Sequence, residues 1–307
     1  MRPVDVNAVV IAVVIAAASS RVGAAPAPAP APAIDLPVAR TVLPGFDDCA
    51  DVACLIERTY QADPKARALA LALWTESGDV AGVGPDEVMD GGYRGKIHLV
   101  PELPIRGYRR HLVWVAEATR SIDKFFAELF AELSAPSYRW RGIAFRFVRS
   151  VGKRTPSAYA TGWAIEYNVE GSLLTSADGV RETVFHELFH ENDEDHGDWS
   201  ASHLQADYDA ILAGCGADPK LSCLAPFAPN NTRVRGGTYY AFQQNNGNAV
   251  HEYAAELAVR YFKEQGEMLA HRRLARPAFK CGPAANARAW KALVDEFFTG
   301  RDLVPAC

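Results

Sequence analysis

The chain has 307 residues, 49% of them hydrophobic, and a net charge of −5 at pH 7. This length and composition allow a substantial buried core and exclude a disordered polymer. The charged residues are interspersed and form no basic stripe, which argues against nucleic acid or an anionic membrane as a partner.

The first 40 residues read as an export segment followed by a spacer. Arg2 precedes an apolar run at residues 8–18, and small residues follow up to Ala24, a layout typical of a secretory signal at residues 1–24. The run is too short to cross a hydrocarbon core of ~30 Å, so we expect a cleaved signal, no stable membrane insertion, and a secreted or periplasmic protein. Alternating Ala and Pro then predict an extended linker over residues 25–40, and residues 41–307 form one domain.

Six cysteines in an exported chain predict disulfides rather than thiolate ligands. The sequence leaves fifteen pairings open, and the pairing with the shortest loops joins Cys49 to Cys54, Cys215 to Cys223 and Cys281 to Cys307.

In the first half, periodicity predicts helices at 49–60 and 64–74, which form a small N-terminal cap. Residues 78–95, rich in Gly and Asp, are expected to be a loop. The following expected elements are a strand at 96–100, a long helix at 108–133, a strand at 143–148 and a strand at 159–169 interrupted by Gly162.

The second half is predicted to be mostly helical. A helix at 178–191 precedes an acidic loop that extends to residue 198, which we expect to be solvated rather than a calcium site. Helical segments at 202–212, 249–269 and 285–298 follow, with a Pro- and Asn-rich segment before residue 249. The fold class is therefore α+β, with a small sheet backed by one helix and a mostly helical lower lobe.

The run Val184 to His190 reads Val-Phe-His-Glu-Leu-Phe-His. On a helix, His186 and His190 lie one turn apart on one face, where two imidazoles can bind one metal ion. Glu187 is placed to accept a proton from a metal-bound water. The alternative is an amphipathic helix that simply buries its apolar residues.

A catalytic zinc site needs a third protein ligand, and the sequence offers two. His196 stands ten residues after His186, a spacing that resembles the metzincin motif. However, Asp193 occupies the position of the glycine that lets the metzincin chain turn, and Met268, the only downstream methionine, lies in a helical run rather than a methionine turn.

Glu252 is the other candidate, on the helix expected at 249–269, with Glu256 one turn further on. The run Glu-Tyr-Ala-Ala-Glu resembles the glutamate helix of the gluzincins, in particular that of lethal-factor-like enzymes. The resemblance implies Zn²⁺ bound by His186, His190 and Glu252, with Glu256 accepting the free ring N–H of a ligand histidine. The element order across residues 96–269 likewise resembles the upper lobe of the zincin metallopeptidases.

Such peptidases have a further donor that stabilises the oxyanion of the reaction. Tyr240 is our candidate, with Tyr239 and His251 as alternatives. Lethal-factor-like enzymes carry their tyrosine about two turns before the ligand glutamate, where this chain has Asn245.

The resemblance implies a secreted zinc endopeptidase that acts on a peptide or protein substrate. Three alternatives stay open. They are a metzincin-type peptidase that uses His196, a non-catalytic binding protein on a zincin scaffold, and a structural site in which His196 and Glu252 both bind the metal.

Overall fold

The computed structural model describes residues 33–131, 133–234, 237–243 and 249–307. The expected signal at 1–24 and residues 25–32 of the expected linker lie outside these ranges, whereas residues 36–40 of that linker are helical. The helices are α1 (Leu36–Val42), α2 (Val52–Thr59), α3 (Pro64–Ser77), α4 (Arg109–Leu129), α5 (Ala177–Asp195), α6 (Trp199–His203), α7 (Gln205–Cys215), α8 (Leu221–Leu224), α9 (Ala249–His271) and α10 (Ala284–Phe297). The strands are β1 (Val80–Val83), β2 (Glu87–Asp90), β3 (Lys96–Pro101), β4 (Ala144–Ser150), β5 (Ala158–Thr161) and β6 (Ala164–Asn168).

The six strands form one mixed sheet around β4. The order is β2-β3-β4-β6-β5, and β1 also pairs with β4. Strands β1 and β6 run parallel to β4, whereas β3 pairs antiparallel with its last residues. Two antiparallel hairpins, β2–β3 and β5–β6, complete the sheet. The α+β class is thus confirmed.

Two sequence predictions about the sheet were wrong. Residues 78–95 contain β1 and β2 rather than only a loop. Gly82 in β1 lies so close to α1 that a Cβ there would be 2.0 Å from the Val42 carbonyl oxygen. Because this close approach requires a glycine in the middle of the strand, β1 lacks the alternating large apolar residues by which a strand is recognised in a sequence. The range 159–169 is a hairpin rather than one strand, because Gly162 and Trp163, with φ of 58° and 60°, form the two-residue turn between β5 and β6.

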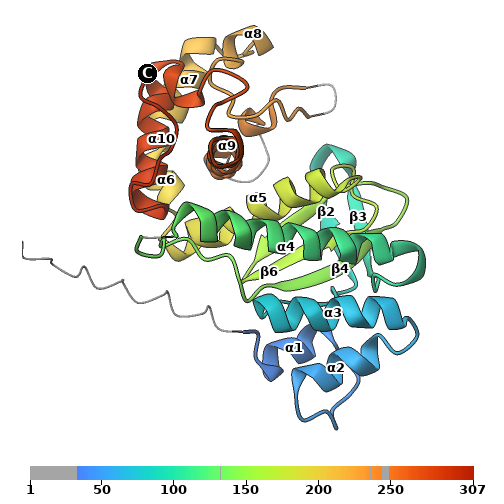
Figure 1. Cartoon of the computed structure of the whole chain (residues 1–307). Coiled ribbons are helices and arrows are strands. Elements are labelled where there is room, and N and C mark those ends of the chain that lie inside the picture. The colour runs from blue at the N-terminus through green and yellow to red at the C-terminus, as the bar shows by residue number, and fades with distance from the viewer. Residues whose placement is uncertain (1–32, 132, 235–236, 244–248) are drawn as a thin grey trace, which may run out of the picture.

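The sheet lies between two helical regions (Figure 1). Helices α1–α3 lie at one end of the molecule, α4 and α5 lie beside the sheet, and α7–α10 lie at the opposite end. Aromatic side chains join α4, α5 and α9: the Phe185 ring stacks on Phe262 at 4.5 Å, and Phe262 meets Phe125 edge-on at 4.7 Å. Within the described residues, no helix has the length and apolar composition needed to cross a bilayer.

All three expected disulfides are present: Cys49–Cys54, Cys215–Cys223 and Cys281–Cys307. They account for all six cysteines. Disulfides of this number fit the oxidising compartment expected for an exported protein.

Candidate metal centre

Helix α5 carries the histidine pair, and its sequence explains both its start and its orientation. The Ser176 side chain caps the helix by accepting the Gly179 N–H at 3.1 Å, and Asp178 adds a negative charge in the first turn. Phe185, Leu188 and Phe189 are buried in the core. Since these apolar residues face the core, His186 and His190 share the remaining face one turn apart.

Helix α9 brings in a third candidate ligand, Glu252, from 66 residues further along the chain. Its Phe262 ring stacks on Phe185 of α5 at 4.5 Å, and the Glu252 carboxylate reaches His186 on the same helix, so packing of α9 on α5 brings Glu252 to the histidines.

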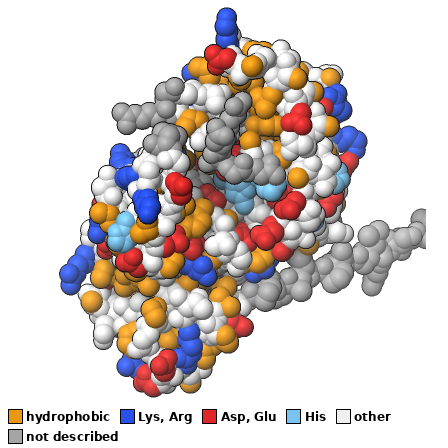
Figure 2. Space-filling model, turned by 180° about the vertical axis from the view of Figure 1, so that it is seen from behind, with side chains coloured by type: hydrophobic (Ala, Val, Ile, Leu, Met, Phe, Trp, Pro, Cys, Tyr) orange, Lys and Arg blue, Asp and Glu red, His pale blue; other side chains and the backbone are white. Residues whose placement is uncertain are grey.

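The side chains of His186, His190 and Glu252 converge. The His186 Nε2 lies 3.1 Å from the His190 Nε2 and 3.0 Å from the Glu252 Oε2, and the third distance, from His190 Nε2 to Glu252 Oε2, is 3.6 Å. One potential ligand atom from each residue lies within 4.8 Å of the others. Two imidazoles and one carboxylate at these separations could hold a metal ion. Figure 2 shows histidine side chains in a hollow between the two halves of the molecule.

The electrostatics of the group reflect its burial and its mutual contacts. Burial lowers the pKa of His186, but the hydrogen bond to Glu252 and the nearby carboxylates raise it, and the net value rises to about 9. Burial raises the pKa of Glu252, but hydrogen bonds to both imidazoles bring it well below its usual range. Because only neutral imidazoles ligate metals, metal binding here must release protons.

Glu187 is 7% exposed and lies among these charges. Burial raises the pKa of its carboxyl group, while His186 and His190 act in the opposite direction and Glu252 adds to the rise. Glu187 is therefore a buried carboxyl group that interacts electrostatically with both imidazoles and with Glu252 without belonging to the three-residue cluster.

Glu256 lies one turn beyond Glu252 on α9. Its Oε1 is 3.7 Å from the His186 Nδ1, and its Oε2 accepts the Thr232 hydroxyl at 3.1 Å. The side-chain amide of Asn230 donates to the Glu256 backbone carbonyl at 2.7 Å. Sequence reasoning missed Asn230 and Thr232, because they lie in an irregular segment whose only signal is its richness in Asn and Pro.

His196 contacts α10 and does not belong to the cluster formed by His186, His190 and Glu252. Its Nδ1 lies 2.7 Å from the Glu296 Oε1 on α10. Helix α5 continues to Asp195, so Asp193 is helical and makes no sharp turn; its buried carboxylate accepts the Ser200 N–H at 2.7 Å. The expected solvated loop at 191–198 was therefore wrong in part, because Glu191 and Asp193 are buried.

Of the candidate oxyanion donors, Tyr240 lies next to the group. Its ring is 5.8 Å from the His186 ring, and it begins the short 3-10 turn Tyr240–Phe242. Tyr239 instead accepts a hydrogen bond from Arg233 at 3.3 Å, and the His251 Nδ1 lies 3.8 Å from the Asp193 Oδ2. Asn245 lies outside the described residues.

Comparisons of the chain with protein-family models, curated proteins and solved structures found no match.

Proposed function

We propose that the chain is a secreted zinc-dependent peptidase with a zincin-like fold. The observation that carries the proposal is the convergence of His186, His190 and Glu252 beside the buried carboxyl group of Glu187. A His₂Glu set leaves room for a fourth, exchangeable position, which is the arrangement of catalytic rather than structural zinc sites. The placement of His196 against Glu296 disfavours both the metzincin-type and the four-ligand alternative.

Each residue has a defined role in the proposed mechanism. His186, His190 and Glu252 would hold the zinc, which would supply Lewis acidity at the carbonyl of the scissile peptide bond. Glu187 accepts the proton of the attacking water and returns it to the leaving amide nitrogen. Tyr240 donates a hydrogen bond to the developing oxyanion.

Glu256 has a supporting role. Its carboxylate faces the ring nitrogen of His186 that does not point toward Glu252, and this contact favours the tautomer in which Nε2 is free to ligate. The side-chain contact from Thr232 fixes that carboxylate in place.

Two measurements on the purified protein test the proposal. Elemental analysis after reconstitution should find about one zinc per chain, and a proteome-derived peptide library should be cleaved by the zinc-loaded protein. Glu187→Gln should keep the zinc and lose roughly 10²–10⁴-fold in turnover, because Gln preserves the shape of the side chain but cannot accept the proton. A zinc content near zero, or near-normal turnover of the variant, would contradict the proposal. A zinc-loaded wild type that cleaves nothing would favour a non-catalytic binding protein.

A further inference from the structure

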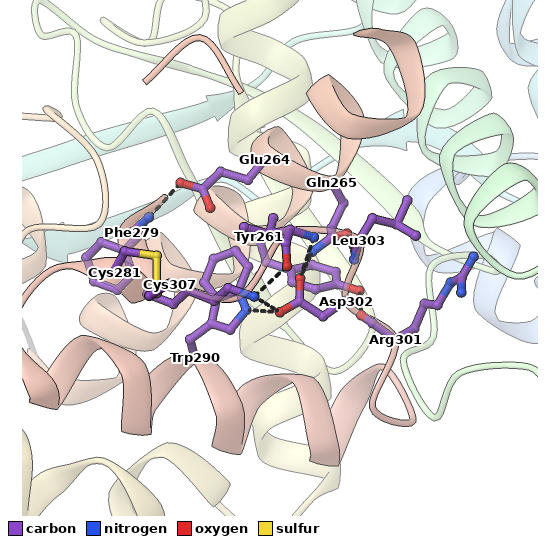
Figure 3. A network of polar contacts seen from close by, with 12 residues as sticks. Tyr261, Glu264, Gln265, Phe279, Cys281, Trp290, Arg301, Asp302, Leu303 and Cys307 are labelled. Carbon is purple, nitrogen blue, oxygen red and sulfur yellow. Dashed lines mark hydrogen bonds and ion pairs between the residues drawn. A yellow bond between two sulfur atoms is a disulfide. The ribbon is translucent and has the colours of Figure 1, made fainter. Parts of the chain in front are cut away.

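The C-terminal residues after α10 form no helix but are bonded along the far end of α9. Tyr261 donates its hydroxyl to the Arg301 carbonyl at 2.6 Å. The Gln265 side-chain amide donates to the Asp302 Oδ1 and accepts the Leu303 N–H, both at 2.8 Å. Gln265 is fully buried, so these bonds are shielded from water. Figure 3 shows this network between α9, α10 and the C-terminal tail.

The carboxylate of Asp302 is the centre of the network. Its Oδ1 accepts from the Gln265 amide at 2.8 Å and from the Val304 N–H at 2.9 Å. Its Oδ2 accepts from the Lys280 ammonium at 2.7 Å and from the Trp290 indole at 2.8 Å. One side chain thus connects α9, the turn Phe279–Cys281, α10 and the tail through four hydrogen bonds, two of them to each oxygen.

The disulfide Cys281–Cys307 closes this arrangement. It joins the residue after Lys280 to the last residue of the chain, so the tail is held on both sides of Asp302. The ring of Tyr261 also stacks on Phe298 at 4.0 Å, which fixes the same part of α9 against the end of α10.

Helix α9 links this network to the candidate metal centre. Gln265 follows Glu252 by thirteen residues on one continuous helix, a separation of about 20 Å at 1.5 Å per residue. A side-chain atom that lies about 6 Å from the helix axis would shift by about 1 Å if the helix rotated by about 10°. Metal–ligand distances are fixed to within about 0.2 Å, so such a rotation would separate the Glu252 carboxylate from the histidine pair.

We propose that Asp302 is a positioning residue for the metal centre, and that the tail acts as a clamp which holds α9 in the rotation that presents Glu252 to the metal. The inference rests on the proposed metal site. It adds a determinant of metal affinity about 20 Å from the ligands, in a part of the chain that the metal motif does not include.

The test compares zinc affinities of the full chain, measured by competition with a chromophoric chelator, and the visible spectrum of the Co²⁺ form. Asp302→Asn should weaken zinc binding about tenfold and alter the Co²⁺ spectrum, because an Asn cannot accept all four hydrogen bonds and α9 is released. Gln265→Met removes the two hydrogen bonds that Gln265 makes to the tail and leaves that of Tyr261. It should have the same effect, and it replaces Asp302→Asn as the test if that variant does not fold. The double variant should bind zinc no more weakly than either single variant, because both changes break the same network.

The matched control is Asp123→Asn on α4, whose carboxylate also accepts from an indole, at 2.7 Å from Trp140, and from a cation, at 2.6 Å from Arg141. It should lower the melting temperature while changing zinc affinity less than twofold. Unchanged zinc affinity in Asp302→Asn and Gln265→Met, or an equal loss in the control, would overturn the inference while leaving the peptidase proposal intact. A wild type that binds no zinc would overturn both.

Discussion

Asp79→Asn should remove a pH-dependent loss of stability from this protein. Asp79 is fully buried between α3 and the start of β4, where its Oδ2 is hydrogen-bonded to the Ser77 hydroxyl at 2.6 Å and its Oδ1 accepts the Ile143 N–H at 2.8 Å. Burial raises its pKa from 3.8 to about 7, although these two hydrogen bonds act in the opposite direction. An Asn can keep both contacts, because the Ser77 hydroxyl already donates to the Leu73 carbonyl and its oxygen can accept from the amide.

The magnitude follows from the difference between the folded and unfolded states. Between pH 4 and pH 7 the folded protein keeps a proton on Asp79 that the unfolded chain has released, so the free energy of unfolding falls as the pH rises. The loss is absent below the unfolded pKa and complete above the folded one. A shift of about three pKa units corresponds to up to about 4 kcal/mol, a large part of the 5–15 kcal/mol that is typical of a folded domain.

Urea unfolding of both proteins across pH 4 to pH 8 measures this difference. We expect the variant and the wild type to have similar stability near pH 4, and the variant to be more stable by a few kcal/mol at pH 8. Asp51→Asn is the control, because this exposed residue caps α2 through the Cys54 N–H and Asn caps helices equally well. A difference between Asp79→Asn and the wild type that does not vary with pH would refute the reasoning.

Three further predictions concern the metal centre. Glu252→Gln should weaken zinc binding by at least about 10²-fold, because each ligand contributes roughly 3 kcal/mol to binding. His196→Ala should leave the zinc affinity near that of the wild type. If His196 were the third ligand, isothermal titration with zinc would show the reverse order of affinities. Glu256→Gln should weaken zinc binding about 10–100-fold through the orientation of the ligand histidine, and an affinity equal to that of the wild type in the same titration would contradict this role. Tyr240→Phe should lower kcat about 10²–10³-fold with the zinc content unchanged, and an unaltered kcat in a peptide-cleavage assay would assign the oxyanion donor to another residue.

Long periodic helices were the most predictable part of the fold. The expected helix at 249–269 is α9, Ala249–His271, and the expected helix at 108–133 is α4, Arg109–Leu129. In α4, apolar residues recur at helical spacing along one face that packs against the core, whereas α9 is buried around most of its surface. In both helices the long run of apolar residues at helical spacing is enough to identify a helix. The short strands β1 and β2 lack such a pattern. β1 depends on long-range pairing with β4, and β2 is an edge strand that pairs only with its neighbour β3.

The candidate site was also predictable only where the signal is local in the sequence. The spacing of His186, Glu187 and His190 is local, so helical geometry alone predicts that the imidazoles share a face. Glu252 was found only through a resemblance in its own short run, because its distance from the histidines depends on the packing of α9 against α5. The contacts of Asn230 and Thr232 with Glu256 come from an irregular segment, and no sequence period predicts where such a segment folds back.

The disulfides and the candidate metal centre cross-link the chain over very different lengths. The three disulfides join residues 5, 8 and 26 positions apart, so each closes a short loop. His186 and Glu252 are 66 positions apart and belong to helices in different halves of the molecule. The entropy that a cross-link removes from the unfolded chain grows with the length of the loop that it closes. A metal bound at this centre would therefore remove more entropy from the unfolded chain than any one of the three disulfides.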